Sequence, residues 1–263
     1  MFAVAVGLLP GTAATQTSVS AFELAALDTA NSLVLFRSDA PQTTRTVPIS
    51  GARGAMIGID VRPMDGKLYG ITDTGALHTI EPRTGAATLV SQLGSPFDGT
   101  TASGFDFNPQ SDRLRLIAGT GQNLRVNVDV GAVAIDGTLS YAADDNHAGR
   151  RPQVAATAYT NSVARAPTTV TFDIDHALDI LVRQEPPNDG VLATVGPLGI
   201  DCAETTGFDI ATDARGADHA FLVCGAKLYR LDLESGAARM LGSIGAAQTR
   251  FIGLAVLAGA GAR

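Results

Sequence analysis

The sequence predicts an all-β protein, a five-bladed β-propeller with four antiparallel strands in each blade. Two observations predict this fold. A short apolar motif recurs five times along the 263 residues, and each interval between copies holds three further short runs with alternating apolar and polar residues. The chain also starts with three such runs and ends with one copy of the motif, so its two ends complete one blade. Repeats of this length with four strands each are typical of propeller blades.

The recurring motif is expected to form the innermost strand of each blade. Its aligned positions, Gly58, Gly104, Ala156, Gly207 and Gly253, are 46, 52, 51 and 46 residues apart. Three copies carry an aspartate two residues after the glycine. The copies are MIGIDVRP at 56–63, ASGFDFNP at 102–109, TTGFDIAT at 205–212, RFIGLAVL at 250–257, and the degenerate VAATAYTN at 154–161.

The intervals between the copies supply the other three strands of each blade. Turn residues such as Asp65–Gly66 and Thr74–Gly75 separate the runs, and no stretch shows helical periodicity. The runs are GKLYGIT, GALHTIEP and AATLVSQL; DRLRLIAG, QNLRVNVD and AVAIDGTL; TTVTFDID, ALDILVRQE and GVLATVGPL; and DHAFLVCG, AKLYRLDL and AARMLGSI.

The two ends of the chain are expected to build the remaining blade together. FELAALD, NSLVLFRSD and TTRTVPIS, between residues 22 and 50, lack a leading glycine motif, whereas RFIGLAVL supplies that strand alone. The C-terminal strand would thus join three N-terminal strands and close the ring, which removes exposed sheet edges. The sequence therefore predicts twenty strands in five blades.

The propeller is expected to occupy residues 22–257 as a single domain, followed by a tail at 258–263. Residues 1–21 contain the apolar run FAVAVGLL and end in small and polar residues, as the back half of a signal peptide does, but lack its positively charged start. They are interpreted as a signal-peptide remnant, or else as a disordered or strand-forming N-terminus.

The composition of the chain indicates which classes of molecule it is not expected to bind. The formal net charge is −7, and the 19 basic residues are scattered singly apart from Arg150 and Arg151, so nucleic acid and anionic membranes are poor candidates. No run approaches the roughly 18 to 20 apolar residues that span a bilayer. We expect a secreted or periplasmic monomer without a membrane span.

The two cysteines, Cys202 and Cys224, have none of the spacings typical of zinc or redox sites. In an exported protein they would form one disulfide, and the alternative is a pair of small buried apolar side chains.

Three long strings resemble a known family. LYGITDTGALHTIEPRTGAATLV, GFDFNPQSDRLRLIAGTGQNLRVN and the closing IGLAVL are similar to an uncharacterised family of bacterial exported proteins, a domain of unknown function grouped with β-propellers. The resemblance covers residues 22–257 and implies a secreted or cell-surface propeller. It implies no activity, cofactor or catalytic residue. The two cysteines and the lack of a C-terminal sorting tail depart from the family pattern.

Asp60, Asp106 and Asp209 occupy equivalent places in three copies of the motif and should lie near the ring axis. Three carboxylates around one channel could hold a hard cation such as Ca²⁺, with carbonyl or water ligands beside them. The alternative is structural, because a repeated aspartate commonly accepts hydrogen bonds from backbone N–H groups of a neighbouring segment and so fixes the packing of blades.

A second candidate site comes from irregular segments, since a ligand site needs asymmetry. In the strand QNLRVN, alternation places Asn123, Arg125 and Asn127 on one face, and the degenerate motif copy is followed by Tyr159 and Asn161. We interpret these five residues as a ligand-binding surface. The alternative is a hydrogen-bonded contact between blades, with Arg113 and Arg115 as solvated or aspartate-paired residues at a strand edge.

Sequence motifs of catalysis are missing, so the catalytic residues, if any, are unknown. There is no GxSxG elbow, the four histidines are isolated in sequence, and no glycine-rich phosphate loop opens a helix. The segment 144–149, DDNHAG, starts like a calcium loop but has Ala148 at the fifth position and Ala155 at the twelfth. We expect a polar loop between blades there.

Three functions fit this pattern. The first is an exported, non-enzymatic module that binds a protein, glycan or small ligand on one face of the ring and needs no cofactor. The alternative is a calcium-assisted hydrolase or lyase that acts through a cation held by Asp60, Asp106 and Asp209. The third is a purely structural surface module.

Overall fold

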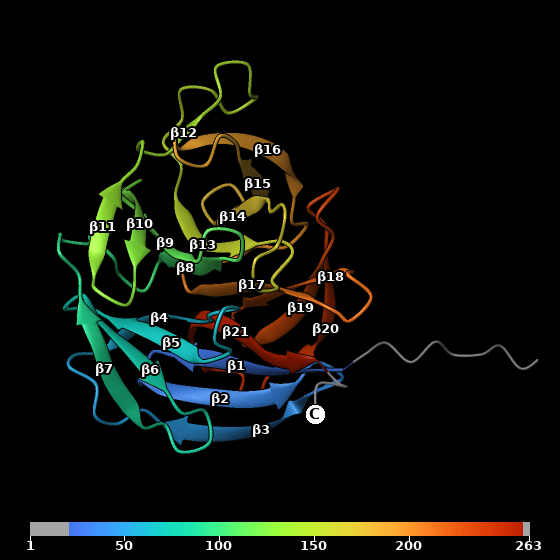
Figure 1. Ribbon diagram of the computed structural model, residues 1–263. Helices are drawn as coiled ribbons and strands as arrows, with labels where there is room; N and C mark the ends of the chain where they lie inside the picture. Colours follow the sequence, from blue (N-terminus) through green and yellow to red (C-terminus); the bar gives the residue numbers. More distant parts are fainter. Residues whose placement is uncertain (1–20, 260–263) are drawn as a thin grey trace, which may run out of the picture.

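The computed structural model describes residues 21–259 and confirms the five-bladed β-propeller. Figure 1 shows five sheets around a common centre, with one strand of each sheet nearest to it. Residues 21–259 form strands and turns without any helix, and a membrane-spanning helix is therefore absent from this part of the chain. The interpretation of residues 1–21 as a signal-peptide remnant and of 258–263 as a tail falls almost wholly outside the residues whose side chains are described.

Each blade has four antiparallel strands that follow one another outward from the axis in sequence order, except that the innermost strand of blade 1 comes from the C-terminal end and blade 4 has a further, parallel strand at its outer edge. Blade 1 consists of β21 (Phe251–Gly259), β1 (Phe22–Asp28), β2 (Ser32–Arg37) and β3 (Ala40–Pro48). Blade 2 consists of β4 (Met56–Val61), β5 (Leu68–Thr72), β6 (Ala76–Ile80) and β7 (Ala87–Gln92). Blade 3 consists of β8 (Ser103–Asn108), β9 (Arg113–Ala118), β10 (Asn123–Asn127) and β11 (Ala132–Ile135). Blade 4 consists of β13 (Val154–Tyr159), β14 (Thr171–Asp175), β15 (Ile180–Gln184), β16 (Val191–Pro197) and β12 (Ser140–Tyr141). Blade 5 consists of β17 (Thr206–Thr212), β18 (Asp218–Cys224), β19 (Lys227–Leu231) and β20 (Ala238–Ser243).

The ring closes as the sequence predicts. β21 pairs antiparallel with β1, with Ala25 opposite Ala255 and Leu27 opposite Gly253, so strands from both chain ends share one sheet. The innermost strands β4, β8, β13, β17 and β21 each contact the innermost strands of both neighbouring blades. The first and last parts of the chain are therefore joined by backbone hydrogen bonds.

The structure differs from the prediction by one strand. β12 pairs in parallel with the outer edge of β16, so blade 4 has five strands and the total is twenty-one. This strand follows β11 directly and crosses from blade 3 to blade 4, where the N–H of Ser140 donates to the carbonyl of Gly190 (2.9 Å). A pairing of two residues with a distant blade leaves no periodic signal in the local sequence.

The repeated glycine of the motif is explained by the close approach of the innermost strands. A Cβ at Gly58 would lie 2.7 Å from the Cβ of Phe105, and one at Gly104 would lie 2.8 Å from Cγ2 of Thr157. Such distances are too short for carbon atoms, so glycine is required for this spacing. The axis at this level is almost filled, with a cavity of only about 10 Å³.

The hydrophobic core is divided among the spaces between blades. Five clusters of buried apolar side chains each join one sheet to the next, as expected where blades pack face to face. The space between blades 3 and 4 also holds buried polar side chains, among them Arg115, Asn123 and Asp173.

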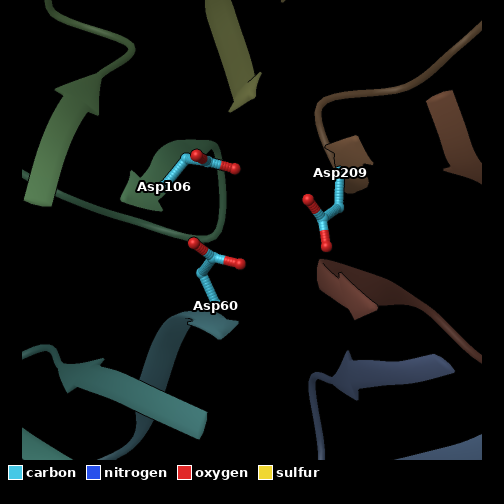
Figure 2. A group of neighbouring side chains, drawn as sticks. All are labelled: Asp60, Asp106 and Asp209. Carbon is cyan, nitrogen blue, oxygen red and sulfur yellow. The ribbon is translucent and has the colours of Figure 1, made fainter. Parts of the chain in front are cut away.

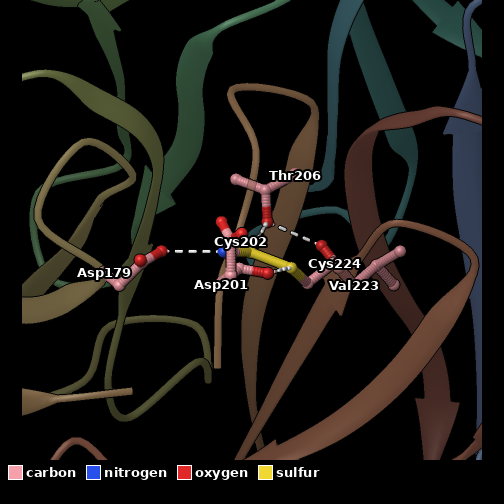
Figure 3. The surroundings of a disulfide bond; sticks show 6 residues. All are labelled: Asp179, Asp201, Cys202, Thr206, Val223 and Cys224. Atoms are coloured by element: carbon pink, nitrogen blue, oxygen red, sulfur yellow. Dashed lines mark hydrogen bonds between the residues drawn. A yellow bond between two sulfur atoms is a disulfide. The ribbon is translucent and has the colours of Figure 1, made fainter. Parts of the chain in front are cut away.

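Cys202 and Cys224 form a disulfide, with 5.5 Å between their Cα atoms (Figure 3). The disulfide ties the segment before β17 to the end of β18 within blade 5. The N–H of Cys202 also donates to Oδ1 of Asp179 in blade 4 (2.7 Å), so the same segment joins two blades. Of the two alternatives left open by the sequence, the structure contains the disulfide.

Candidate ligand and metal site

Asp60, Asp106 and Asp209 come together at the ring axis, as their equivalent places in the motif predict (Figure 2). They lie on the innermost strands β4, β8 and β17, and one carboxylate oxygen from each lies within 4.8 Å of the other two. All three side chains are buried, at 4 to 5% exposure. The same place in the other two blades is taken by Ala158 and Ala255.

Each of the three aspartates also holds the next blade. Oδ2 of Asp60 accepts a hydrogen bond from the N–H of Phe107 in blade 3 (2.9 Å). In the same way, Oδ1 of Asp106 accepts from Tyr159 in blade 4 (3.3 Å), and Oδ2 of Asp209 accepts from Val256 in blade 1 (2.6 Å). These N–H groups belong to the innermost strands, which have no further strand paired on the axis side among residues 21–259. The structural role expected for a repeated aspartate is thus observed in the same side chains that make up the candidate cation site.

The charges of the three carboxylates are not balanced by any basic side chain among residues 21–259. Burial raises the pKa of Asp209 to about 7. Burial, together with the charge of Asp209, raises the pKa of Asp60 well above its usual range. Burial and the charges of the other two aspartates do the same for Asp106. Such a group must take up protons or a cation near neutral pH.

A cavity of about 220 Å³ lies beside two of these carboxylates, at the end of the ring where the innermost strands finish. Asp60 and Asp209 form part of its wall, whereas the axis on the other side of them is almost filled. The rest of the cavity is lined by Phe22, Val61, Pro63, Gly66, Ser162, Ala211, Thr212, Val256 and Leu257. We call this space the mouth cavity.

Residues 160–170, which connect β13 to β14, form a loop across this end of the ring. The N–H of Ser162 donates to Oγ1 of Thr212 in blade 5 (2.7 Å), and the N–H of Arg165 donates to the carbonyl of Pro109 in the turn between β8 and β9 of blade 3 (3.0 Å). The loop from blade 4 is therefore held by both neighbouring blades. Asn161 shapes it: its φ is 55°, and its Nδ2 donates to the carbonyl of Thr168 (2.9 Å).

The other residues of the predicted ligand surface lie mainly between blades 3 and 4, around the buried guanidinium of Arg115. Nε of Arg115 donates to the hydroxyl of Tyr159 (2.6 Å), and NH1 donates to Oδ1 of Asn123 and to Oδ2 of Asp136 (3.1 Å). Arg125 lies at the rim of this cluster and pairs with Asp136 through two hydrogen bonds of 2.7 and 2.9 Å.

These contacts are those of an interblade network. Asn123 and Tyr159 are nearly fully buried, and Nδ2 of Asn123 donates to the carbonyls of Gly137 and Pro187 (3.2 and 3.1 Å). Asn127 lies apart from the cluster and accepts a hydrogen bond from the N–H of Asp129 within its own turn (3.1 Å). The structure thus groups Asn123, Arg125 and Tyr159 but not Asn127 or Asn161, and a ligand role for the five stays a prediction.

Sequence reasoning missed the buried Asp173 of this interface and expected Arg115 at a strand edge. Arg115, at 1% exposure, is paired with Asp136 but lies in the interior and not at a strand edge. Asp173 on β14 is fully buried, neither of its carboxylate oxygens has a hydrogen-bond partner among the described residues, and burial raises its pKa to about 7. The alternation in TVTFDID places Asp173 opposite Phe172 and Ile174, but in a propeller both faces of a middle strand are buried, so alternation does not identify a solvent face.

Comparison with known proteins supports the fold and identifies the family. A protein of unknown function from Bacteroides thetaiotaomicron VPI-5482 superposes with a TM-score of 0.50 at 18% identity, over 83% of this chain and 57% of that one. A protein of unknown function from Bacteroides caccae has a TM-score of 0.43 at 13% identity. The match covers 88% of this chain and 77% of that one. An auxiliary nutrient binding protein from Bacteroides ovatus ATCC 8483 has a TM-score of 0.45 at 16% identity. The match covers 75% of this chain and 51% of that one.

The chain thus spans little more than half the length of the first of these proteins, and at such identities the likeness concerns the fold alone. No curated protein matches the sequence significantly. Residues 32–255, which cover most of the propeller, match the domain of unknown function DUF4394. The chain therefore belongs to the DUF4394 family, and its fold is a five-bladed β-propeller.

Proposed function

We propose that this protein is an exported binding module that holds a divalent cation, calcium, at the mouth of its propeller channel and binds its ligand there. The observation that carries the proposal is the group formed by Asp60, Asp106 and Asp209. Their carboxylate oxygens lie within 4.8 Å of one another, buried and without a basic partner.

Calcium suits this group better than other common metals. All the side-chain donors are carboxylate oxygens, which favour hard cations over zinc. Calcium accepts six to eight oxygen ligands in irregular geometry, whereas magnesium demands a near-ideal octahedron and keeps several waters. Because each aspartate is also fixed by a backbone hydrogen bond to the next blade, the three carboxylates are held in place before the ion arrives.

Export is supported by the disulfide between Cys202 and Cys224, since disulfides persist in oxidising compartments such as the periplasm and the cell exterior. We place the protein in one of these compartments.

The proposal is tested by titration calorimetry of the chelator-treated protein with calcium chloride and, separately, with magnesium chloride. We expect one calcium to bind per chain and magnesium to bind more weakly. Asp106→Asn removes one ligand charge while its amide oxygen can still accept the hydrogen bond from Tyr159, so calcium binding should weaken at least tenfold. Asp144→Asn, an exposed aspartate outside the group, is the matched control and should bind as the wild type does. Absence of calcium binding to the wild type, or equal binding by the Asp106 variant, would overturn the proposal.

A further inference from the structure

The mouth cavity has walls of an unusual kind for a space beside carboxylates. Besides Asp60 and Asp209, six of its lining side chains are apolar, and none is lysine, arginine or histidine. Ser162 contributes a hydroxyl with no hydrogen-bond partner among the described residues, whereas the hydroxyl of Thr212 already donates to Asp218 (2.7 Å). A ligand in this cavity therefore meets apolar walls, a single available hydroxyl, and the cation site at one side.

The three aspartates do not satisfy a calcium ion by themselves. Both oxygens of Asp60 accept backbone hydrogen bonds, from Val61 (2.6 Å) and Phe107 (2.9 Å), and Oδ2 of Asp209 accepts one from Val256. Oδ2 of Asp106 accepts none from any described residue, and Figure 2 shows this carboxylate directed toward the other two. Since calcium takes six to eight oxygens, coordination by one oxygen from each aspartate leaves ligand positions open to water or to oxygen atoms of a molecule in the mouth cavity.

Charge and size restrict what those outside ligands can be. Three carboxylates and one divalent cation leave one net negative charge, and no basic side chain lines the cavity, so an anionic ligand is disfavoured. A volume of about 220 Å³ lies below the roughly 300 to 1,000 Å³ of pockets for drug-sized ligands, so the cavity suits one small ring and not a larger molecule.

We infer that the mouth cavity binds a single neutral sugar residue, with two neighbouring hydroxyls of the sugar completing the coordination of the calcium ion. This inference rests on the proposed function. The apolar C–H face of the sugar ring would pack on Val256 and Leu257, and Ser162 would bond to a third hydroxyl. A polyol meets every feature of the cavity, because it supplies oxygen ligands without adding charge.

The test is saturation-transfer NMR of the protein with mannose, fucose and galactose, each measured with calcium and again after addition of a chelator. Galacturonate and putrescine serve as the anionic and cationic comparisons. We expect transfer to at least one neutral sugar in the presence of calcium, its loss with the chelator, and no transfer to either charged probe.

Replacing an alanine of the cavity wall by leucine tests the cavity separately from the cation site. Ala211→Leu adds volume to the cavity wall without touching a carboxylate, so it should reduce sugar affinity at least tenfold and leave calcium affinity within twofold. Ala134→Leu, on the exposed face of β11, is the matched control and should change neither.

Failure of this inference differs from failure of the proposed function. Calcium binding without transfer to any of the three sugars would overturn the sugar inference and leave the cation site standing. Transfer to a sugar that persists after chelation, or transfer to putrescine in the metal-free protein, would overturn coordination through calcium. Absence of calcium binding would overturn both.

Discussion

At the scale of single residues, the aspartates of the motif accept hydrogen bonds from backbone N–H groups and also form the candidate cation site. Asp60 shows this most clearly, because it accepts hydrogen bonds from the N–H groups of Val61 and Phe107 and also borders the mouth cavity. Removing the carboxylate would affect the packing of blades even without a ligand. Charge and hydrogen bonding can be separated by comparing alanine with asparagine at the same position.

We expect Asp60→Ala to lower the free energy of unfolding of the metal-free protein by about 1 to 3 kcal/mol, because it leaves buried N–H groups without an acceptor. Asp60→Asn loses the buried charge and one of the two acceptor oxygens but keeps the other for Phe107, so it should cost less than alanine. Urea unfolding monitored by circular dichroism measures both. Equal stability of the two variants would show that the hydrogen bond to blade 3 contributes nothing.

Asp173 is a residue whose burial opposes folding at neutral pH. Thr157 lies opposite it on β13, but the hydroxyl of Thr157 donates to the carbonyl of Phe172 (3.4 Å), and both oxygens of Asp173 are left without a partner. Burial raises its pKa to about 7, against about 3.9 in an unfolded chain. Because the folded state binds the proton more tightly, this contribution to stability is present below about pH 4 and is lost as the pH rises through about 7.

Above about pH 7, Asp173→Asn should therefore have a free energy of unfolding up to about 4 kcal/mol higher than that of the wild type. The difference should vanish near pH 4. The measurement is urea unfolding of both proteins across that pH range. A difference that grows toward acid pH would show that the carboxylate is stabilised by the fold.

At the scale of elements, the strands of the blades follow from local patterns, and the pieces that cross between blades do not. The runs DRLRLIAG and QNLRVNVD predict β9 and β10 from alternation and turn residues. β12 and the 160–170 loop depend on partners in other blades, such as Gly190 and Pro109, which no local pattern identifies. The same limit hides from the sequence the hydrogen bond by which the side chain of Asn161 shapes this loop, and its ligand role stays a prediction.

The disulfide is the strongest restraint on blade 5 that does not depend on packing. It closes a loop with a sequence separation of 22 residues. The chain-entropy estimate for a loop of this length is about 3 kcal/mol. We expect the double variant Cys202→Ala, Cys224→Ala to lose about that much free energy of unfolding while keeping the far-ultraviolet circular dichroism of the fold. A loss below about 0.5 kcal/mol would show that packing and the hydrogen bond to Asp179 stabilise this segment without the disulfide.

At the scale of the whole molecule, the ring allowed much of the site to be predicted. Asp60, Asp106 and Asp209 could be placed together from sequence because equivalent positions of a closed repeat must surround one axis. The mouth cavity could not be predicted from the sequence. Part of its lining comes from β1, the end of β21 and a loop of blade 4, and these meet only when the ring closes. The buried network of Arg115 could not either, since it needs two facing blades.

The central claim is that a cation occupies the mouth of the ring, and thermal unfolding of the metal-free protein with and without calcium tests it most directly. A ligand that binds only the folded state at a hundred times its Kd adds about 2.7 kcal/mol, which for a chain of this size corresponds to about 5 to 10 °C in Tm. We predict a rise of that order for the wild type and Asp144→Asn, and a much smaller one for Asp106→Asn. An unchanged Tm of the wild type at millimolar calcium, or the same rise in the Asp106 variant, would contradict the account.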